Sequence, residues 1–96
     1  MSVRENKVET YFKDQIKALG GITRKWVSPG VDGVPDQIVI MKGGIFFAEI
    51  KTSDGKKSPA QLREQARLQK NGALVITLYG EKDVDRFIKY LEKYNK

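Results

Sequence analysis

Three charged residues, Asp36, Glu49 and Lys51, stand at the ends of two strand-like runs of apolar residues. An unpaired ion buried among apolar neighbours costs several kcal/mol or more, so such positions normally carry valine or isoleucine. Two converging carboxylates repel each other unless a cation lies between them, and Mg²⁺ is usually held by one or two carboxylates with waters and phosphate oxygens. The pattern therefore indicates a site for metal-assisted hydrolysis of phosphodiester bonds.

The chemistry expected of this group divides between the metal and the lysine. A bound divalent metal lowers the pKa of its water ligand and withdraws charge from phosphorus. Lys51 lies two residues after Glu49, on the same strand face, where its ammonium can orient the attacking water or stabilise a pentacoordinate phosphate. An ordinary ion pair between Glu49 and Lys51 at a strand end is the alternative, but it leaves Asp36 unexplained.

The geometry of the group depends on the turn between the two strands, which are joined across residues 42–44 in a glycine-containing hairpin signal. A two-residue turn places Asp36 on the face that carries Glu49, opposite either Glu49 or Lys51 according to which pair forms the turn. A three-residue loop without a bulge would place Asp36 on the other face. The short turn is favoured, and it gathers two carboxylates and an ammonium at one end of the sheet.

The surrounding residues predict the helices and strands that hold this hairpin. Ser58 as N-cap, Pro59 at the first helical position and Gln61 at the third form a capping box that starts a helix. Apolar periodicity and turn residues give the other elements. The expected order is α-β-β-β-α-β-α, with helix 3–19, strands 22–27, 36–41 and 45–51, helix 58–70, strand 73–79 and helix 82–94.

This order predicts a mixed α/β sheet. The hairpin is antiparallel, whereas strands 45–51 and 73–79 should be parallel and joined by a right-handed crossover through helix 58–70. Both hairpin strands are apolar on both faces, so helices should cover both sides of the sheet. A chain of 96 residues is the size of a single domain, here 1–96.

The composition narrows the function further. Eighteen Lys and Arg against twelve Asp and Glu give a net charge of +6, which favours a polyanion as partner. The absence of histidine excludes HNH-type nucleases, histidine-based triads and most zinc enzymes, so a metal would bind oxygen ligands, as Mg²⁺ and Mn²⁺ do. There is no cysteine, no long apolar run and no signal-peptide pattern, so the expected location is the cytoplasm.

The sequence resembles a known nuclease family in several segments. Pro35-Asp36, twelve residues and then Glu49-Ile50-Lys51 match the PD-(D/E)XK nuclease motif. The segments VETYF, ALGG, KWVSPGVDGVPD, FFAEIKT and KKSPAQ, with the closing strand and helix, resemble the VRR-NUC family of virus-type replication-repair nucleases within that superfamily. The resemblance implies a restriction-endonuclease-like core, with a mixed central sheet and helices on both faces.

The resemblance also implies roles for residues at matching positions. Lys51 would be the catalytic lysine, and Glu9, in VETYF, would be the helix-borne glutamate that completes the acidic site. Glu5 lies one turn earlier on nearly the same face, and Glu9 is favoured over it. The implied metal ligands are Asp36, Glu49, the backbone carbonyl of Ile50, and Glu9.

Other matching positions have two readings each. Gln61 matches a catalytic-site glutamine often found after the motif strand, but the capping box explains it equally well. Lys25 matches a basic residue that touches phosphate, and it could also be an exposed strand lysine. Lys56 and Lys57 are near the active edge, where they would grip backbone phosphate or form a solvated loop.

These observations predict a Mg²⁺- or Mn²⁺-dependent endonuclease that recognises DNA structure, encoded by a bacterium or phage and acting in DNA repair. The resemblance implies branched DNA, above all four-way (Holliday) junctions, as substrate. A two-fold homodimer would match the symmetry of such a junction, with exposed apolar residues of the terminal helices as candidate contacts. The alternatives are a nonspecific or restriction-like DNase or nickase, and an inactive basic DNA-binding module.

Overall fold

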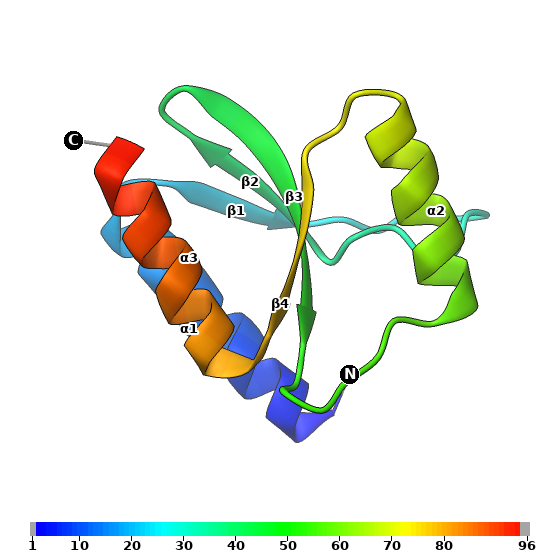
Figure 1. Cartoon of the computed structure of the whole chain (residues 1–96), viewed down its shortest axis with the longest axis horizontal. Helices are drawn as coiled ribbons and strands as arrows, with labels where there is room; N and C mark the ends of the chain where they lie inside the picture. Colours follow the sequence, from blue (N-terminus) through cyan, green and yellow to red (C-terminus); the bar gives the residue numbers. More distant parts are fainter. Residues whose placement is uncertain (1, 95–96) are drawn as a thin grey trace.

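The helices and strands follow one another in the predicted order. The computed structural model describes residues 2–94, and Figure 1 shows them along the chain. The elements are α1 Val3–Ala18, β1 Ile22–Lys25, β2 Gln37–Met41, β3 Gly44–Lys51, α2 Pro59–Lys70, β4 Val75–Tyr79 and α3 Gly80–Tyr94. No helix in this part of the chain is long and apolar enough to cross a membrane.

The four strands form one mixed sheet in the order β1-β2-β3-β4. β2 pairs antiparallel with β1 and β3, and β3 pairs parallel with β4, as predicted. Met41 pairs with Gly44, so Lys42 and Gly43 form a two-residue turn, with Gly43 in the left-handed conformation at φ 100°. The same register pairs Gln37 with Ala48, and its continuation sets Asp36 opposite Glu49.

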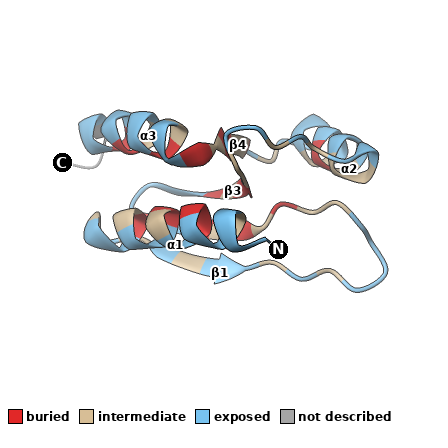
Figure 2. Cartoon of the chain, turned by 90° about the horizontal axis from the view of Figure 1, so that it is seen from below, coloured by how far each residue is buried: buried red, intermediate tan, exposed pale blue. Residues whose placement is uncertain are grey.

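The helices divide between the two sides of the sheet. Figures 1 and 2 both show α1 and α3 side by side on one side of β3 and β4, with α2 on the other. The buried apolar core lies between the sheet and the α1–α3 pair. It consists of Val8, Phe12, Ile16, Val39, Met41, Phe46, Ala48, Ile50, Leu78, Val84, Ile88 and Leu91.

Some element ends differ from the predicted ones. The first strand ends at Lys25, although the N–H of Trp26 still donates to the Asp36 carbonyl at 3.0 Å. The last helix begins at Gly80, two residues early, because the Asp83 carboxylate accepts the N–H of Tyr79 at 2.9 Å. Neither difference moves the residues that carry the predicted chemistry.

Candidate active site

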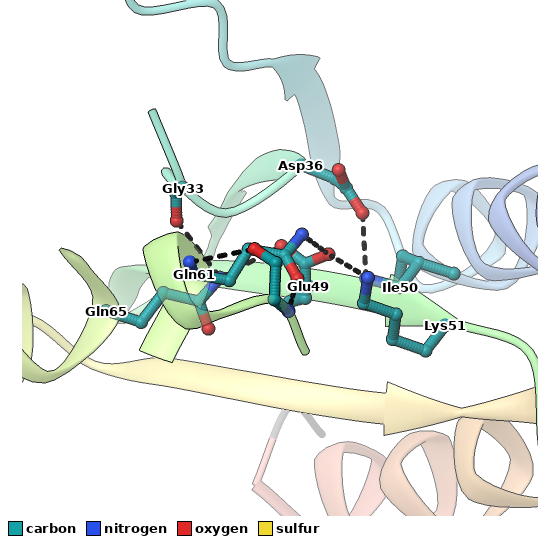
Figure 3. Close-up of polar contacts among 8 residues, drawn as sticks. Gly33, Asp36, Glu49, Ile50, Lys51, Gln61 and Gln65 are labelled. Atoms are coloured by element: carbon teal, nitrogen blue, oxygen red, sulfur yellow. Dashed lines mark hydrogen bonds and ion pairs between the residues drawn. The ribbon is translucent and has the colours of Figure 1, made fainter. Parts of the chain in front are cut away.

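Asp36 and Glu49 meet where β2 begins and β3 approaches its end. Oδ2 of Asp36 accepts a hydrogen bond from the backbone N–H of Ile50 at 2.9 Å. This contact fixes the Asp36 side chain against the strand that carries Glu49, as the two-residue turn requires. Figure 3 shows Asp36 directed toward Ile50, with Glu49 and Lys51 on either side along β3.

The carboxylate of Glu49 is buried and held from several sides, with its side chain only 2% exposed. Oε1 accepts from Nε2 of Gln65 at 2.9 Å, and Oε2 accepts from Nε2 of Gln61 at 3.0 Å. Nζ of Lys51 lies 3.8 Å from Oε2. Two amide donors and one ammonium therefore surround a single carboxylate (Figure 3).

The surroundings of Glu49 change its acidity. Burial disfavours the charged carboxylate and the neighbouring Asp36 repels it, and together they raise the pKa of Glu49 to about 7. Lys51 and the hydrogen bond from Gln65 act in the opposite direction. A carboxyl group with a pKa near neutrality beside a second carboxylate is a feature typical of functional sites.

Gln61 forms the predicted capping box and also contacts Glu49 with the same side chain. Oε1 accepts from the backbone N–H of Ser58 at 2.9 Å, and the Ser58 hydroxyl accepts from the N–H of Gln61 at 3.1 Å, which completes the capping box. Nε2 is then free to donate to Glu49. The start of α2 and the candidate site therefore share one amide.

Gln65 was missed in the sequence, although it is 1% exposed and contacts the site directly. Besides Glu49, its Nε2 donates to the carbonyl of Gly33 at 3.3 Å, and so joins α2 to the loop before Asp36. Gly33 has φ +91°, and a Cβ there would lie 2.3 Å from the carbonyl oxygen of Ala60. Only glycine allows the loop to approach α2 so closely.

Glu9 is not part of this group. It is buried on α1, where its Oε1 accepts from Nε2 of Gln37 at 2.9 Å and its Oε2 has no hydrogen-bond partner among the described residues. Gln37 pairs with Ala48, so alternation along the strands places Gln37 and Glu49 on opposite faces of the sheet. Within residues 2–94, no three acidic side chains are grouped to hold a metal ion.

The three lysines predicted to bind phosphate form no ion pair with the site among the described residues. Lys25 is the exposed last residue of β1, paired with Gln37. Lys56 is exposed and Lys57 half-buried, both in the loop that leads from Lys51 to α2. The alternative candidate on α1, Glu5, is half-buried at the helix start, where its N–H donates to the hydroxyl of Ser2 at 3.1 Å.

Comparison with known proteins identifies the class of this site. No protein-family model matches the chain. It is 44% identical over 77 residues to the protein named "Putative nuclease p44" from Acyrthosiphon pisum secondary endosymbiont phage 1, a match that covers 79% of this chain and 83% of that protein. A solved structure described as a VRR_NUC domain superposes with a TM-score of 0.82 and 37% identity, covering 92% of this chain and 97% of that one.

The fold and the comparisons together define a nuclease, an enzyme that hydrolyses phosphodiester bonds. Both matches span most of each chain, so the similarity extends over the α-β-β-β-α-β-α arrangement and is not limited to one motif. The chain belongs to the VRR-NUC family.

Proposed function

We propose that this protein is a divalent-metal-dependent endonuclease that cuts branched DNA, with four-way (Holliday) junctions as its substrate. The observation that carries the proposal is the convergence of the Asp36 and Glu49 carboxylates next to the ammonium of Lys51. The net charge of +6 suits a polyanionic substrate.

The residues of the site fit Mg²⁺ or Mn²⁺. Asp36 and Glu49 supply hard oxygen ligands. The repulsion from Asp36 that helps to raise the pKa of Glu49 is one that a cation bound by both carboxylates would relieve. The backbone carbonyl of Ile50 would be a further ligand. When bound, the metal would activate water and draw charge from the phosphate.

The chain's own residues have separable tasks in this proposal. Gln61 and Gln65 hold the Glu49 carboxylate in one orientation, and the N–H of Ile50 does the same for Asp36. Lys51 would place its ammonium at the attacking water or at the phosphate oxygens, where negative charge develops.

Glu9 would act one step further from the reaction. Its hydrogen bond from Gln37 fixes that residue, which directly follows Asp36 in the chain. Its second oxygen is buried and lacks a donor, an arrangement compatible with a water or cation bound at that end of the strand. This assigns Glu9 a positioning role, in place of the direct ligation implied by the resemblance.

Junction cleavage also implies two sites, because a four-way junction has two equivalent strands related by a two-fold axis. We therefore include a homodimer in the proposal. Exposed Val3 and Tyr90 fit the expected contacts on the terminal helices. A second candidate surface is the stripe of Ile22, Ile40 and Ile45, which are cross-strand neighbours and 45%, 39% and 58% exposed.

A cleavage assay on labelled four-way junctions tests the activity. Wild type should cut in Mg²⁺ or Mn²⁺, whereas Asp36→Asn and Glu49→Gln should bind the junction at least as well and not cut it, because they lose the metal ligands and also a repulsion against phosphate. If both variants cut at wild-type rates, the proposed site is wrong.

Light scattering and a cruciform plasmid test the dimer. The free protein should have about twice the mass of 10.9 kDa, and paired nicks should linearise the plasmid. A monomer that makes only single nicks would leave a general structure-selective nickase. The phage-encoded relative suggests that the enzyme works in the cytoplasm of a host cell.

A further inference from the structure

A cavity of about 510 Å³ lies at the end of the sheet where β3 and β4 both finish. Figure 1 shows the start of α1, the end of β3 and the start of α3 meeting at this place, at the bottom of the view. Residues from separate segments line it, among them Thr52 and Ser53, which follow β3, and Tyr79 at the end of β4. Tyr79 is the cross-strand partner of Lys51, so the cavity begins beside the candidate active site.

The charge of this cavity is mainly positive. Arg4, Lys7 and Lys82 line it, against the single carboxylate of Glu81. Nη2 of Arg4 is paired with Oδ1 of Asp54 at 3.3 Å. Neither Lys7 nor Lys82 forms an ion pair with any residue between 2 and 94, and both are exposed. Two ammonium groups from different helices are therefore available to a ligand.

Two of these cations, Arg4 and Lys82, lie in the first turns of their helices, α1 and α3, where a positive charge is unfavourable for stability. Lys7 follows one turn after Val3. The helix macrodipole places partial positive charge at these ends, so it stabilises anions there and disfavours cations. The ion pair with Asp54 accounts for Arg4, whereas Lys7 and Lys82 have no ion-pair partner among residues 2–94, and an anionic ligand would supply one.

We propose that this cavity binds a phosphodiester group of the DNA strand, one that flanks the phosphate cut at Asp36, Glu49 and Lys51. The inference rests on the proposed nuclease function and adds a location for the strand. Thr52 and Ser53 directly follow Lys51, so a strand whose scissile phosphate faces Lys51 and continues past the end of β3 reaches the cavity. Lys7 and Lys82 hold the phosphate by charge.

A matched pair of double variants tests the site. Lys7→Ala/Lys82→Ala removes the two free cations, and Lys17→Ala/Lys93→Ala removes two exposed lysines from the last turns of the same helices, with the same change in net charge. Both are made in the Asp36→Asn protein, and binding to a labelled junction is measured in metal-free buffer across a range of salt. Thermal unfolding of each double variant shows that it is folded.

The loss of one phosphate contact should change the log–log salt slope by about 0.9, which at 0.1 M salt corresponds to about eightfold weaker binding. We expect this change for Lys7→Ala/Lys82→Ala and a smaller one for the control. Equal changes in the two double variants would mean that only net charge matters, and would overturn the proposal.

Neutral methylphosphonate linkages, placed one at a time beside the cleavage position, then locate the contact. One position should weaken the binding of the Asp36→Asn protein about eightfold and have no further effect on the Lys7→Ala/Lys82→Ala protein. If every position weakens both proteins equally, the cavity holds no strand phosphate. This binding test needs no cleavage, so a failure here is distinct from a failure of the nuclease assay.

Discussion

Nε2 of Gln65 lies 2.9 Å from Oε1 of Glu49 and 3.3 Å from the carbonyl oxygen of Gly33. One buried amide therefore links the strand that carries Glu49 to the loop that delivers Asp36. The carboxylates of Asp36 and Glu49 come from different strands. Helix α2, which carries Gln65, connects the strand of Glu49 to the loop that precedes Asp36. This relationship makes α2 part of the proposed active site.

Gln65→Leu should reduce cleavage without unfolding the protein. Leucine fills a similar volume but cannot donate, and a hydrogen bond to a charged group contributes about 1.5–3 kcal/mol. The Gln65 hydrogen bond lowers the pKa of Glu49, so its loss should raise that pKa. The increase of kcat/KM with pH should then occur at a higher pH. The control is Gln69→Leu, one turn later, whose amide donates to Val75 instead. Identical pH–rate profiles for the two variants would contradict a positioning role.

Gln61→Glu should separate the two functions of Gln61. A glutamate at this position still accepts the N–H of Ser58, so the capping box and the start of α2 persist. The new glutamate can no longer donate a hydrogen bond to Glu49, and when it is ionised its carboxylate repels that of Glu49. We expect cleavage to fall at least tenfold, about 1.4 kcal/mol, with helicity by circular dichroism unchanged.

The reverse separation comes from Ser58→Ala. This variant loses one capping hydrogen bond, at a cost of about 1 kcal/mol, and keeps the donor to Glu49. It should lower the melting temperature and leave most of the activity. Full activity of Gln61→Glu would mean that Gln61 serves only the helix.

Gly33→Ala should cost more stability than Gly30→Ala. Both glycines have positive φ, +91° and +84°, so both alanines meet the same backbone strain of about 1–2 kcal/mol. Only at Gly33 does the new Cβ meet another segment, the backbone of Ala60. Urea denaturation should show the difference, and only Gly33→Ala should also impair cleavage, since it displaces the loop before Asp36. Equal losses of unfolding free energy in the two variants would show that the close approach of Gly33 to Ala60 does not affect stability.

The metal-free protein should lose stability as pH rises through about 7. The carboxyl of Glu49 has a pKa of about 7 when folded against an ordinary value of 4.5, so folding favours the protonated form. That contribution is complete below pH 4.5 and is lost as Glu49 ionises, with a total of about 3 kcal/mol. Denaturation at a series of pH values should show this decline for wild type and for Glu64→Gln, a half-buried control. Glu49→Gln should not decline, and a parallel decline in it would refute the assignment.

Local patterns predicted the parts of this structure that local chemistry determines. The capping box placed the start of α2 at Pro59, and the two-residue turn placed Asp36 on the face of Glu49, opposite either Glu49 or Lys51. The observed pairing of Met41 with Gly44 sets it opposite Glu49. Each of these features depends on neighbours within a few residues or on the parity of one hairpin. Such features are readable before the tertiary structure is known.

The residues that were missed or misplaced depend on packing between distant segments. Gln65 is an uncharged residue in a helix interior, a position that is usually solvated, and only its spacing of four from Gln61 could have indicated a shared face. Gln37 lies on the buried face of its strand, in line with Val39 and Met41, which indicates that its side chain has a buried polar partner. That partner is Glu9 on α1. The sequence pattern of α1 does not determine which face of the sheet the helix covers, so the contact could not be predicted.

The two-residue turn at Lys42 and Gly43 sets a rule for the spacing of the motif across related chains. Twelve residues, 37–48, separate Asp36 from Glu49. Lengthening the hairpin by one residue on each strand keeps the two carboxylates opposite each other, whereas a single insertion in either strand turns one of them to the far face. Relatives that keep both carboxylates should therefore have even-numbered spacings, and an odd spacing should coincide with a β-bulge that restores the parity.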